Sequence, residues 1–228
     1  MIIAIDGPSG AGKSTLGKML AKKLNLLYLD TGAMYRAVGL AVLEANVRFE
    51  EKAKVAAIVE NAKIELIGEP ENLQIKLDGR DVSKEIRTNE VGQAASIVST
   101  ISEVRKILVA HQRLLGENAP HGCVLDGRDI GTIVFPNADV KFFLTAKPEA
   151  RAQRRYEEDL ARGLKATYEK TLEEINRRDK RDVSRDDSPL TIAEDAIVID
   201  TSELNLTEVF EQMTEIVREI EMTNYETP

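Results

Sequence analysis

The glycine-rich segment GPSGAGKS, residues 7–14, constrains the fold of this chain more than any other feature. The apolar run MIIAI precedes it at residues 1–5 and is typical of a short strand buried in a parallel sheet. Apolar residues then recur at helical spacing from residue 14 to residue 24. Ordering glycine costs conformational entropy, so a cluster of glycines marks a backbone with a special task. The pattern therefore predicts a functional turn between a buried strand and a helix.

The turn fits G-x-x-x-x-G-K-[ST], with Gly7, Gly12, Lys13 and Ser14 at the defined positions. Glycines let consecutive backbone N–H groups point inward around a phosphate, and the N-terminus of the following helix also favours an anion. Lys13 can reach the β- and γ-phosphates of a nucleotide, and the Ser14 hydroxyl can ligate Mg²⁺. A glycine turn that arose by chance is the alternative. We favour nucleotide binding because the strand and the helix that the motif requires are both present.

Strand and helix patterns alternate along the rest of the chain. This order predicts an α/β fold, a doubly wound parallel sheet of about five strands flanked by helices, in a single P-loop domain over residues 1–228. The expected strands lie at residues 1–5, 26–29, 122–129, 140–146 and 196–200. The expected helices lie at residues 14–24, 33–46, 51–63, 89–115, 148–161, 168–182 and 206–222.

Residues 63–85 depart from this pattern. Short runs there alternate apolar and polar residues, with turn residues between them. We expect a small antiparallel β sheet, within an insert subdomain that covers residues 62–90.

Composition excludes several classes of protein. The net charge of −8 argues against a general nucleic-acid binder, which needs a basic face. A single cysteine, Cys123, rules out an internal disulfide framework and a cysteine zinc site, and two histidines are too few for a multi-histidine metal site. The first residues lack the basic region of a signal peptide, and no apolar stretch approaches the roughly 20 residues that span a bilayer. We expect a cytoplasmic protein that binds no membrane and, since nothing demands an oligomer, a monomer.

Asp126 ends the expected strand GCVLD and is a candidate for holding Mg²⁺, directly or through water. An aspartate that caps a helix or a turn fits the same position equally well.

Arginines gather in the segment EINRRDKRDVSRDD, residues 174–187. On a helix, Arg178, Arg181, Asp182 and Arg185 share one face. A solvated surface held together by ion pairs is the alternative interpretation. We favour an anion site because like charges repeat on that face, and arginines that close over a transferring phosphoryl group stabilise its charge. The segment predicts an Arg-rich helical lid over residues 150–188 that would also exclude water.

With these residues collected, the sequence resembles the bacterial cytidylate kinases, a family of nucleoside monophosphate kinases. The resemblance runs nearly end to end, and the insert is similar to the enlarged NMP-binding subdomain of that family. It rests on IDGPSGAGKST (5–15), LDTGAMYR (29–36), DVSKEIRTNEV (81–91), VRKILVAHQR (104–113), DGRDIGTIVFP (126–136) and RRDKRDVSR (177–185). It implies transfer of the γ-phosphoryl group of ATP to CMP or dCMP with Mg²⁺.

The resemblance also implies roles for individual residues. The ATP phosphates would be held by Gly7, Pro8, Ser9, Gly10, Ala11, Gly12, Lys13, Ser14 and Thr15, with Ser14 and Asp126 at the metal. The acceptor would be held by Thr31, Arg36, Arg128 and Arg185, the first of which stands where some relatives have serine. The lid would bring Arg178 and Asp182 to the sugar or the transferring phosphate. The catalytic residues would be Lys13, Arg128, Arg178 and Arg181.

The cytosine edge would be read by Ser96, Arg105 and Asp129. A carboxylate accepts from the 4-amino group of cytosine and an arginine donates to its N3 and O2, whereas a uracil carbonyl would be repelled by the carboxylate. Ser96, in AASIVST, fits helix packing equally well on its own sequence context.

Two alternatives stay open. One is a P-loop kinase that acts on UMP, dTMP or a non-nucleotide alcohol. The other is a regulatory module that uses ATP only as a switch, although the lid arginines argue against it. The absence of an N-K-x-D motif weakens a GTPase interpretation.

Overall fold

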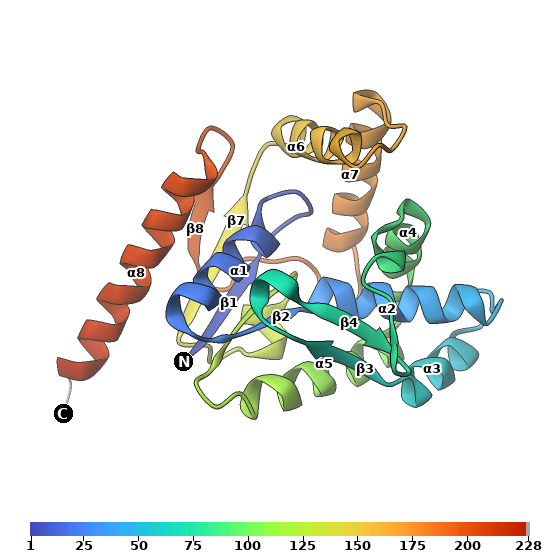
Figure 1. The fold of residues 1–228 in the computed structure, drawn as a ribbon, viewed down its shortest axis with the longest axis horizontal. Helices are drawn as coiled ribbons and strands as arrows, with labels where there is room; N and C mark the ends of the chain where they lie inside the picture. The colour runs from blue at the N-terminus through green and yellow to red at the C-terminus, as the bar shows by residue number, and fades with distance from the viewer. Residues whose placement is uncertain (227–228) are drawn as a thin grey trace.

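The computed structural model describes the backbone of residues 1–226 and the side chains of residues 1–223. Its centre is a five-stranded sheet with the strand order β2-β6-β1-β7-β8, and every neighbouring pair is parallel (Figure 1). The strands are β1 (Ile2–Asp6), β2 (Leu27–Asp30), β6 (Cys123–Gly127), β7 (Val140–Thr145) and β8 (Ile197–Asp200). This confirms the predicted parallel sheet and its strand number.

Helices cover both faces of the sheet. They are α1 (Lys13–Leu24), α2 (Thr31–Glu44), α3 (Lys52–Asn61), α4 (Asn89–Val98), α5 (Ser102–Glu117), α6 (Pro148–Ala161), α7 (Tyr168–Val183) and α8 (Leu206–Glu226). Successive residues of β1 point to opposite faces. Ile3 and Ile5 pack with apolar residues of α1 and α8, whereas Ala4 packs with Leu29, Leu125 and residues of α5. No helix in the described part of the chain is long and apolar enough to cross a membrane.

The register of the sheet gathers acidic residues at one edge. Parallel pairing places Asp30, at the end of β2, opposite Asp126 in β6. The same pairing places Asp6, at the end of β1, opposite Gly127. Ligands of open α/β sheets bind outside the carboxyl ends of the strands, so this edge positions the site.

The insert forms the expected antiparallel sheet, with the order β3-β4-β5. Its elements are β3 (Ile64–Ile67), β4 (Gln74–Leu77), β5 (Arg80–Asp81) and the short 3₁₀ helices η1 (Pro70–Asn72) and η2 (Glu85–Arg87). Ile75 and Ile86 are buried in one apolar cluster with Met34 and Val38 of α2. The insert therefore shares a core with the helices beside it, and its status as a separate subdomain stays a prediction.

Two helices differ from the prediction by more than two residues at a boundary. The helix expected over residues 89–115 is interrupted between α4 and α5. Ser99 and Thr100 donate their hydroxyl hydrogens to the carbonyls of Ser96 and Ile97, at 2.9 and 2.8 Å, and Ile101 is extended. Hydroxyl groups that bond to nearby carbonyls compete with helix continuation. At the other end of the chain, α8 extends to Glu226, beyond the expected end at residue 222.

Candidate active site

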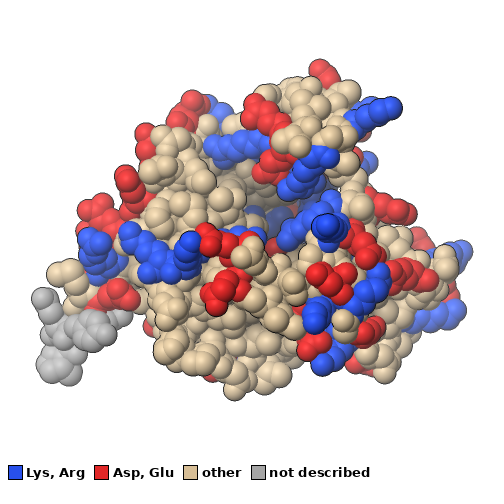
Figure 2. All heavy atoms as spheres, in the orientation of Figure 1, with Lys and Arg blue, Asp and Glu red and all other residues tan. Residues whose placement is uncertain are grey.

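A charged cleft of about 570 Å³ lies at the carboxyl ends of β1, β2 and β6, beneath the helix pair α6 and α7. Lysines and arginines surround this hollow in Figure 2. The described residues that line it include five carboxylates and eleven lysines or arginines: Lys13, Lys18, Arg36, Arg87, Arg105, Arg128, Arg154, Arg155, Arg162, Arg178 and Arg185. Such an excess of positive charge in a chain of net charge −8 indicates a site for polyanions.

The predicted phosphate loop forms one end of the cleft. Gly7 has φ +144°, and a Cβ added to it would lie 2.0 Å from the carbonyl oxygen of Leu144. Only glycine fits that position. Ser9, Gly10 and residues 12–15 line the cleft, whereas Gly7, Pro8 and Ala11 are buried and are not among the lining residues.

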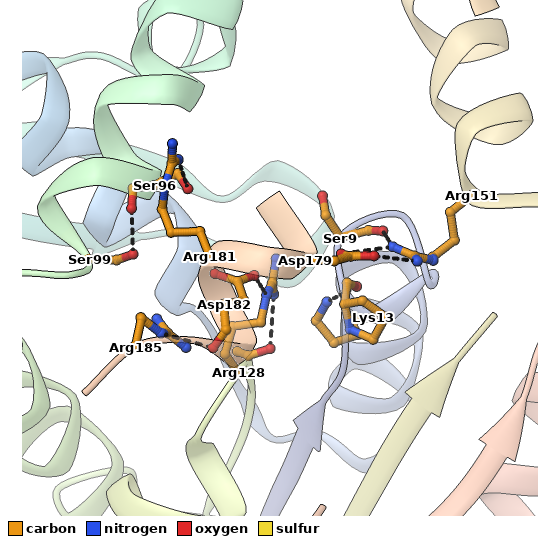
Figure 3. A network of polar contacts seen from close by, with 12 residues as sticks. Ser9, Lys13, Ser96, Ser99, Arg128, Arg151, Asp179, Arg181, Asp182 and Arg185 are labelled. Carbon is orange, nitrogen blue, oxygen red and sulfur yellow. Dashed lines mark hydrogen bonds and ion pairs between the residues drawn. The ribbon is translucent and has the colours of Figure 1, made fainter. Parts of the chain in front are cut away.

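Lys13, the first residue of α1, is folded back over the loop. Its Nζ donates to the carbonyl of Pro8 at 2.8 Å, and the side chain is buried (Figure 3). Burial, and then the nearby cation of Arg128, lower the pKa of Lys13. An anion beside this ammonium group would stabilise its charged form.

Ser14 and Asp126 meet at the base of the cleft. The Ser14 hydroxyl donates to a carboxylate oxygen of Asp126 at 2.6 Å, and the Tyr28 hydroxyl donates to the other at 3.0 Å. Burial, and then the neighbouring Asp30, raise the pKa of Asp126 to about 6. Since its partners are side-chain hydroxyls, Asp126 does not cap a helix or a turn.

This pair fits a magnesium ion. A hydroxyl and a carboxylate are hard oxygen ligands, and Mg²⁺ is usually held by one or two carboxylates together with substrate phosphates. Within the described residues no group of three or more His, Cys, Asp or Glu side chains is placed to hold a metal by itself. The donor set therefore suits an ion that shares its ligands with a nucleotide.

All three residues expected to read cytosine line the cleft, and two of them, Arg105 and Asp129, meet at its other end. Arg105 of α5 forms a buried ion pair with Asp129, in the turn after β6. Arg105 also donates to the Ser99 carbonyl at 3.1 Å, and its guanidinium lies 5.5 Å from the centre of the Tyr35 ring. The Nε of Arg105 and the hydroxyl of Tyr35 are buried without a hydrogen-bond partner. Buried polar groups are normally satisfied, so these two are available to a ligand.

Further arginines line the cleft between the phosphate loop and the Arg105–Asp129 pair. Burial, and then Arg178 and Arg87, lower the pKa of Arg36 to about 9. Burial and the nearby Arg128 lower the pKa of Arg178 to about 10. Arg185 lines the same cleft just beyond the end of α7 and leaves a buried Nη2 without a partner. An anion bound between these arginines would stabilise their charged forms.

Two predicted acceptor residues are already engaged within the protein. The Thr31 hydroxyl donates to the Asp126 carbonyl at 2.6 Å, and both residues line the cleft. Asp182 accepts from Nε of Arg128 at 2.8 Å. Both residues line the cleft, and their roles toward an acceptor stay a prediction.

Arg181 points elsewhere than expected. Its Nη1 donates to the Ser96 hydroxyl of α4 at 2.6 Å, and it is not among the residues that line the cleft (Figure 3). α7 begins at Tyr168, and this position places Arg178 and Asp182 toward the cleft while Arg181 reaches across to α4. In this arrangement Arg181 joins α7 to α4.

Sequence reasoning missed several residues. Asp6 accepts from the backbone N–H groups of Ile130 and Gly131 at 2.8 and 2.7 Å, and burial raises its pKa to about 6. Arg151 joins the carbonyl of Ser9 to the carboxylate of Asp179, with distances of 3.0 and 2.6 Å. Asp6 carried a signal, since it ends a buried strand as Asp126 does. Arg151 carried none, because both of its partners are far away in the sequence.

The sequence is similar to those of known proteins. The model of the cytidylate kinase family matches residues 3–219. A cytidylate kinase of Caldanaerobacter subterraneus is 51% identical over 216 residues, which are 95% of this chain and 94% of that protein. The cytidylate kinase of Bacillus subtilis is 47% identical over 217 residues, 95% of this chain and 96% of that protein.

Solved structures share the fold at low identity. An uncharacterized protein of Eubacterium ventriosum has a TM-score of 0.53 at 16% identity and covers 96% of this chain and 98% of its own. A shikimate kinase of Bacteroides thetaiotaomicron has a TM-score of 0.50 at 15% identity, with 96% and 97% covered.

Proposed function

The chain belongs to the cytidylate kinase family, and we propose that it transfers the γ-phosphoryl group of ATP to CMP or dCMP, which gives ADP and CDP or dCDP. The observation that carries the proposal is the arrangement of the cleft. A phosphate loop lies at one end, a buried Arg105–Asp129 pair lies at the other, and a group of arginines lies between them.

The donor end suits ATP. Backbone N–H groups of the loop and the N-terminus of α1 would hold the β- and γ-phosphates, and the Lys13 ammonium would neutralise their charge. Ser14 and Asp126 would hold Mg²⁺, which supplies further neutralisation of the phosphate oxygens when bound. The hydroxyl of Ser14 would then exchange its present contact with Asp126 for the ion.

The acceptor end suits a cytosine nucleotide. Asp129 would accept from the 4-amino group, and the free Nε of Arg105 would donate to the ring acceptors. A buried carboxylate facing the 4-carbonyl of uracil would repel it, so the same pair supports selection of cytosine over uracil.

Catalysis would rest on positioning and charge. The acceptor oxygen belongs to a phosphate group that is already ionised, so the reaction needs no general base. Arg36, Arg128 and Arg178 would stabilise the charge on the transferred group, and the lid would exclude water that competes as acceptor. The lid over residues 150–188 and the NMP-binding insert over residues 62–90 are parts of this proposal.

The experiment that tests this proposal follows the γ-phosphoryl group of ATP into the products. Protein, Mg²⁺ and ATP labelled in the γ position are incubated with CMP, and the products are separated by chromatography. The proposal predicts label in CDP, and no label transfer in excess EDTA. Label in inorganic phosphate, at a rate independent of CMP, would instead identify an ATPase or a nucleotide switch.

The magnesium site has its own test. Asp126→Asn removes the carboxylate charge and keeps a hydrogen-bond acceptor for Tyr28. We expect this variant to need a higher Mg²⁺ concentration for half-maximal rate. An unchanged Mg²⁺ dependence would exclude Asp126 from the metal site.

A further inference from the structure

The insert reaches the cleft through one side chain. Among the described residues that line the cleft, Arg87 alone comes from residues 62–88. It ends η2, next to Thr88, whose hydroxyl caps α4 by accepting from the Val91 N–H at 3.3 Å. The insert therefore sends a cation, from a fixed point of the backbone, into a site that the proposed function assigns to two nucleotides.

Arg87 is only lightly held. Its Nη2 lies 3.2 Å from a carboxylate oxygen of Asp30, and its side chain is 42% exposed. The other oxygen of Asp30 accepts from the Ala33 N–H at 2.8 Å and caps α2. Because the guanidinium is half-exposed and makes a single polar contact with the described residues, while Asp30 keeps its hydrogen bond from Ala33, Arg87 can exchange this contact for another anion.

The position of Arg87 matches the arginines of the acceptor. Arg36 donates to the carbonyl of Ile86 at 2.9 Å, so η2 holds Arg36 and carries Arg87 in adjacent residues. After burial, the positive charges of Arg178, Arg87 and Arg155 lower the pKa of Arg36. Such a group of cations favours a ligand with more than one negative oxygen.

We propose that Arg87 binds the phosphate group of the acceptor nucleotide, in exchange for its contact with Asp30, and that the insert is in this way part of the acceptor site. A planar guanidinium presents several N–H groups and holds a phosphate through two of them. Among the described residues, Arg87 donates one hydrogen bond, to Asp30, so other N–H groups are ready for the ligand. The inference rests on the proposed function, because it takes the acceptor to be a nucleoside monophosphate.

The test compares CMP with cytidine, which has the same base and sugar without the phosphate. Isothermal titration calorimetry on the full chain measures both dissociation constants. Arg87→Gln is expected to weaken CMP binding about tenfold or more and to leave cytidine binding unchanged. Arg87→Lys keeps the charge and loses the two-point geometry, so we expect it to recover part of the CMP affinity.

Arg80→Gln is the matched control. Arg80 belongs to the same insert, pairs with Glu85 at 2.6 Å and with Glu44, and does not line the cleft. We expect this variant to bind CMP and cytidine as the wild type does. A CMP loss as large as that of Arg87→Gln would assign the effect to disturbance of the insert and overturn the proposal.

Other results would also support or overturn the proposed role of Arg87. Unchanged CMP affinity in Arg87→Gln, or equal losses for CMP and cytidine, would exclude a phosphate contact. Asp30→Asn removes the ion pair and keeps an oxygen that can cap α2, so CMP binding is expected to stay the same or to tighten. A loss of CMP affinity there equal to that of Arg87→Gln would show that Arg87 acts through Asp30. Failure of the proposed function looks different, because the wild type itself would then bind no CMP.

Discussion

The Nε of Arg128 lies 2.8 Å from the carboxylate of Asp182, and this ion pair joins the turn after β6 to helix α7 (Figure 3). Burial raises the pKa of Asp182, but the charges of Arg128 and Arg185 outweigh burial and hold that pKa below its ordinary range. The lid is thus attached to the floor of the cleft by the same arginine that is expected to meet the transferred phosphate. In the proposed function a bound phosphate would compete with Asp182 for Arg128, and this competition would couple the position of α7 to the nucleotide.

Lys13→Ala tests the phosphate loop. Removal of the buried ammonium leaves the phosphate charge without a partner in the transition state, so kcat is expected to fall by about 100-fold or more. Steady-state kinetics with saturating ATP and CMP measure this loss. Lys22→Ala is the control on the same helix, because Lys22 is exposed and pairs with Glu71. A Lys13→Ala variant with near wild-type turnover would remove the loop from the mechanism.

Asp129→Asn tests base recognition. Asparagine keeps the size of the side chain and an oxygen that accepts from Arg105, whereas alanine would leave that buried guanidinium without this hydrogen-bond partner and destabilise the fold more. Loss of a charged hydrogen bond, worth about 1.5–3 kcal/mol, is expected to lower kcat/KM for CMP by about 10- to 100-fold and to spare UMP. The two kcat/KM values are measured side by side. Equal losses would mean that Asp129 is structural or acts on the phosphate.

Arg181→Met tests the lid contact. Arg181 donates to Ser96 from across the cleft, so its loss is expected to loosen the closed lid and to lower kcat about tenfold. Arg177→Met is the control, since Arg177 is exposed on the same helix. The double variant with Ser96→Ala shows whether the two residues act together. If Arg181→Met leaves kcat unchanged, the residue belongs to a solvated surface.

Asp6 is expected to make stability depend on pH. Its pKa is raised from 3.8 to about 6 in the folded protein, chiefly by burial. Between these two pH values the unfolded chain ionises first, so the contribution of Asp6 falls as pH rises and is constant above the folded pKa. Asp6→Asn removes this contribution. The unfolding free energy of the wild type minus that of the variant should fall by about 2 kcal/mol between about pH 4 and pH 7.

Urea unfolding at several pH values measures the difference. A difference that stays flat with pH would show that Asp6 titrates normally.

Local patterns predicted the parts of the fold that depend on neighbouring residues. The apolar runs at residues 1–5 and 140–146 became β1 and β7, because a strand buried on both faces must be apolar along its length. The spacing of Gly7, Gly12 and Lys13 predicted the loop, because its shape depends on backbone freedom within eight residues. The antiparallel insert followed from alternation and turns, which are also local signals.

Contacts between distant residues escaped prediction. The helical pattern over residues 89–115 hid the break at Ser99, where a carbonyl accepts from Arg105. The direction of Arg181 depends on Ser96, 85 residues away in the sequence. Arg87 sits in an insert that the sequence separates from the P-loop, and only the fold carries it to the cleft. Spacing on one helix cannot show which neighbouring element a side chain will meet.

The most direct test of the account is the acceptor specificity of the enzyme. A coupled assay of ADP release, with Mg·ATP as donor, gives kcat/KM for CMP, dCMP, UMP, dTMP and AMP, with a reaction lacking acceptor as the control. We predict the highest kcat/KM for CMP or dCMP and almost no ADP release without acceptor. Faster transfer to UMP, dTMP or AMP would contradict the assignment of Arg105 and Asp129 to cytosine, and ADP release without acceptor would contradict the kinase itself.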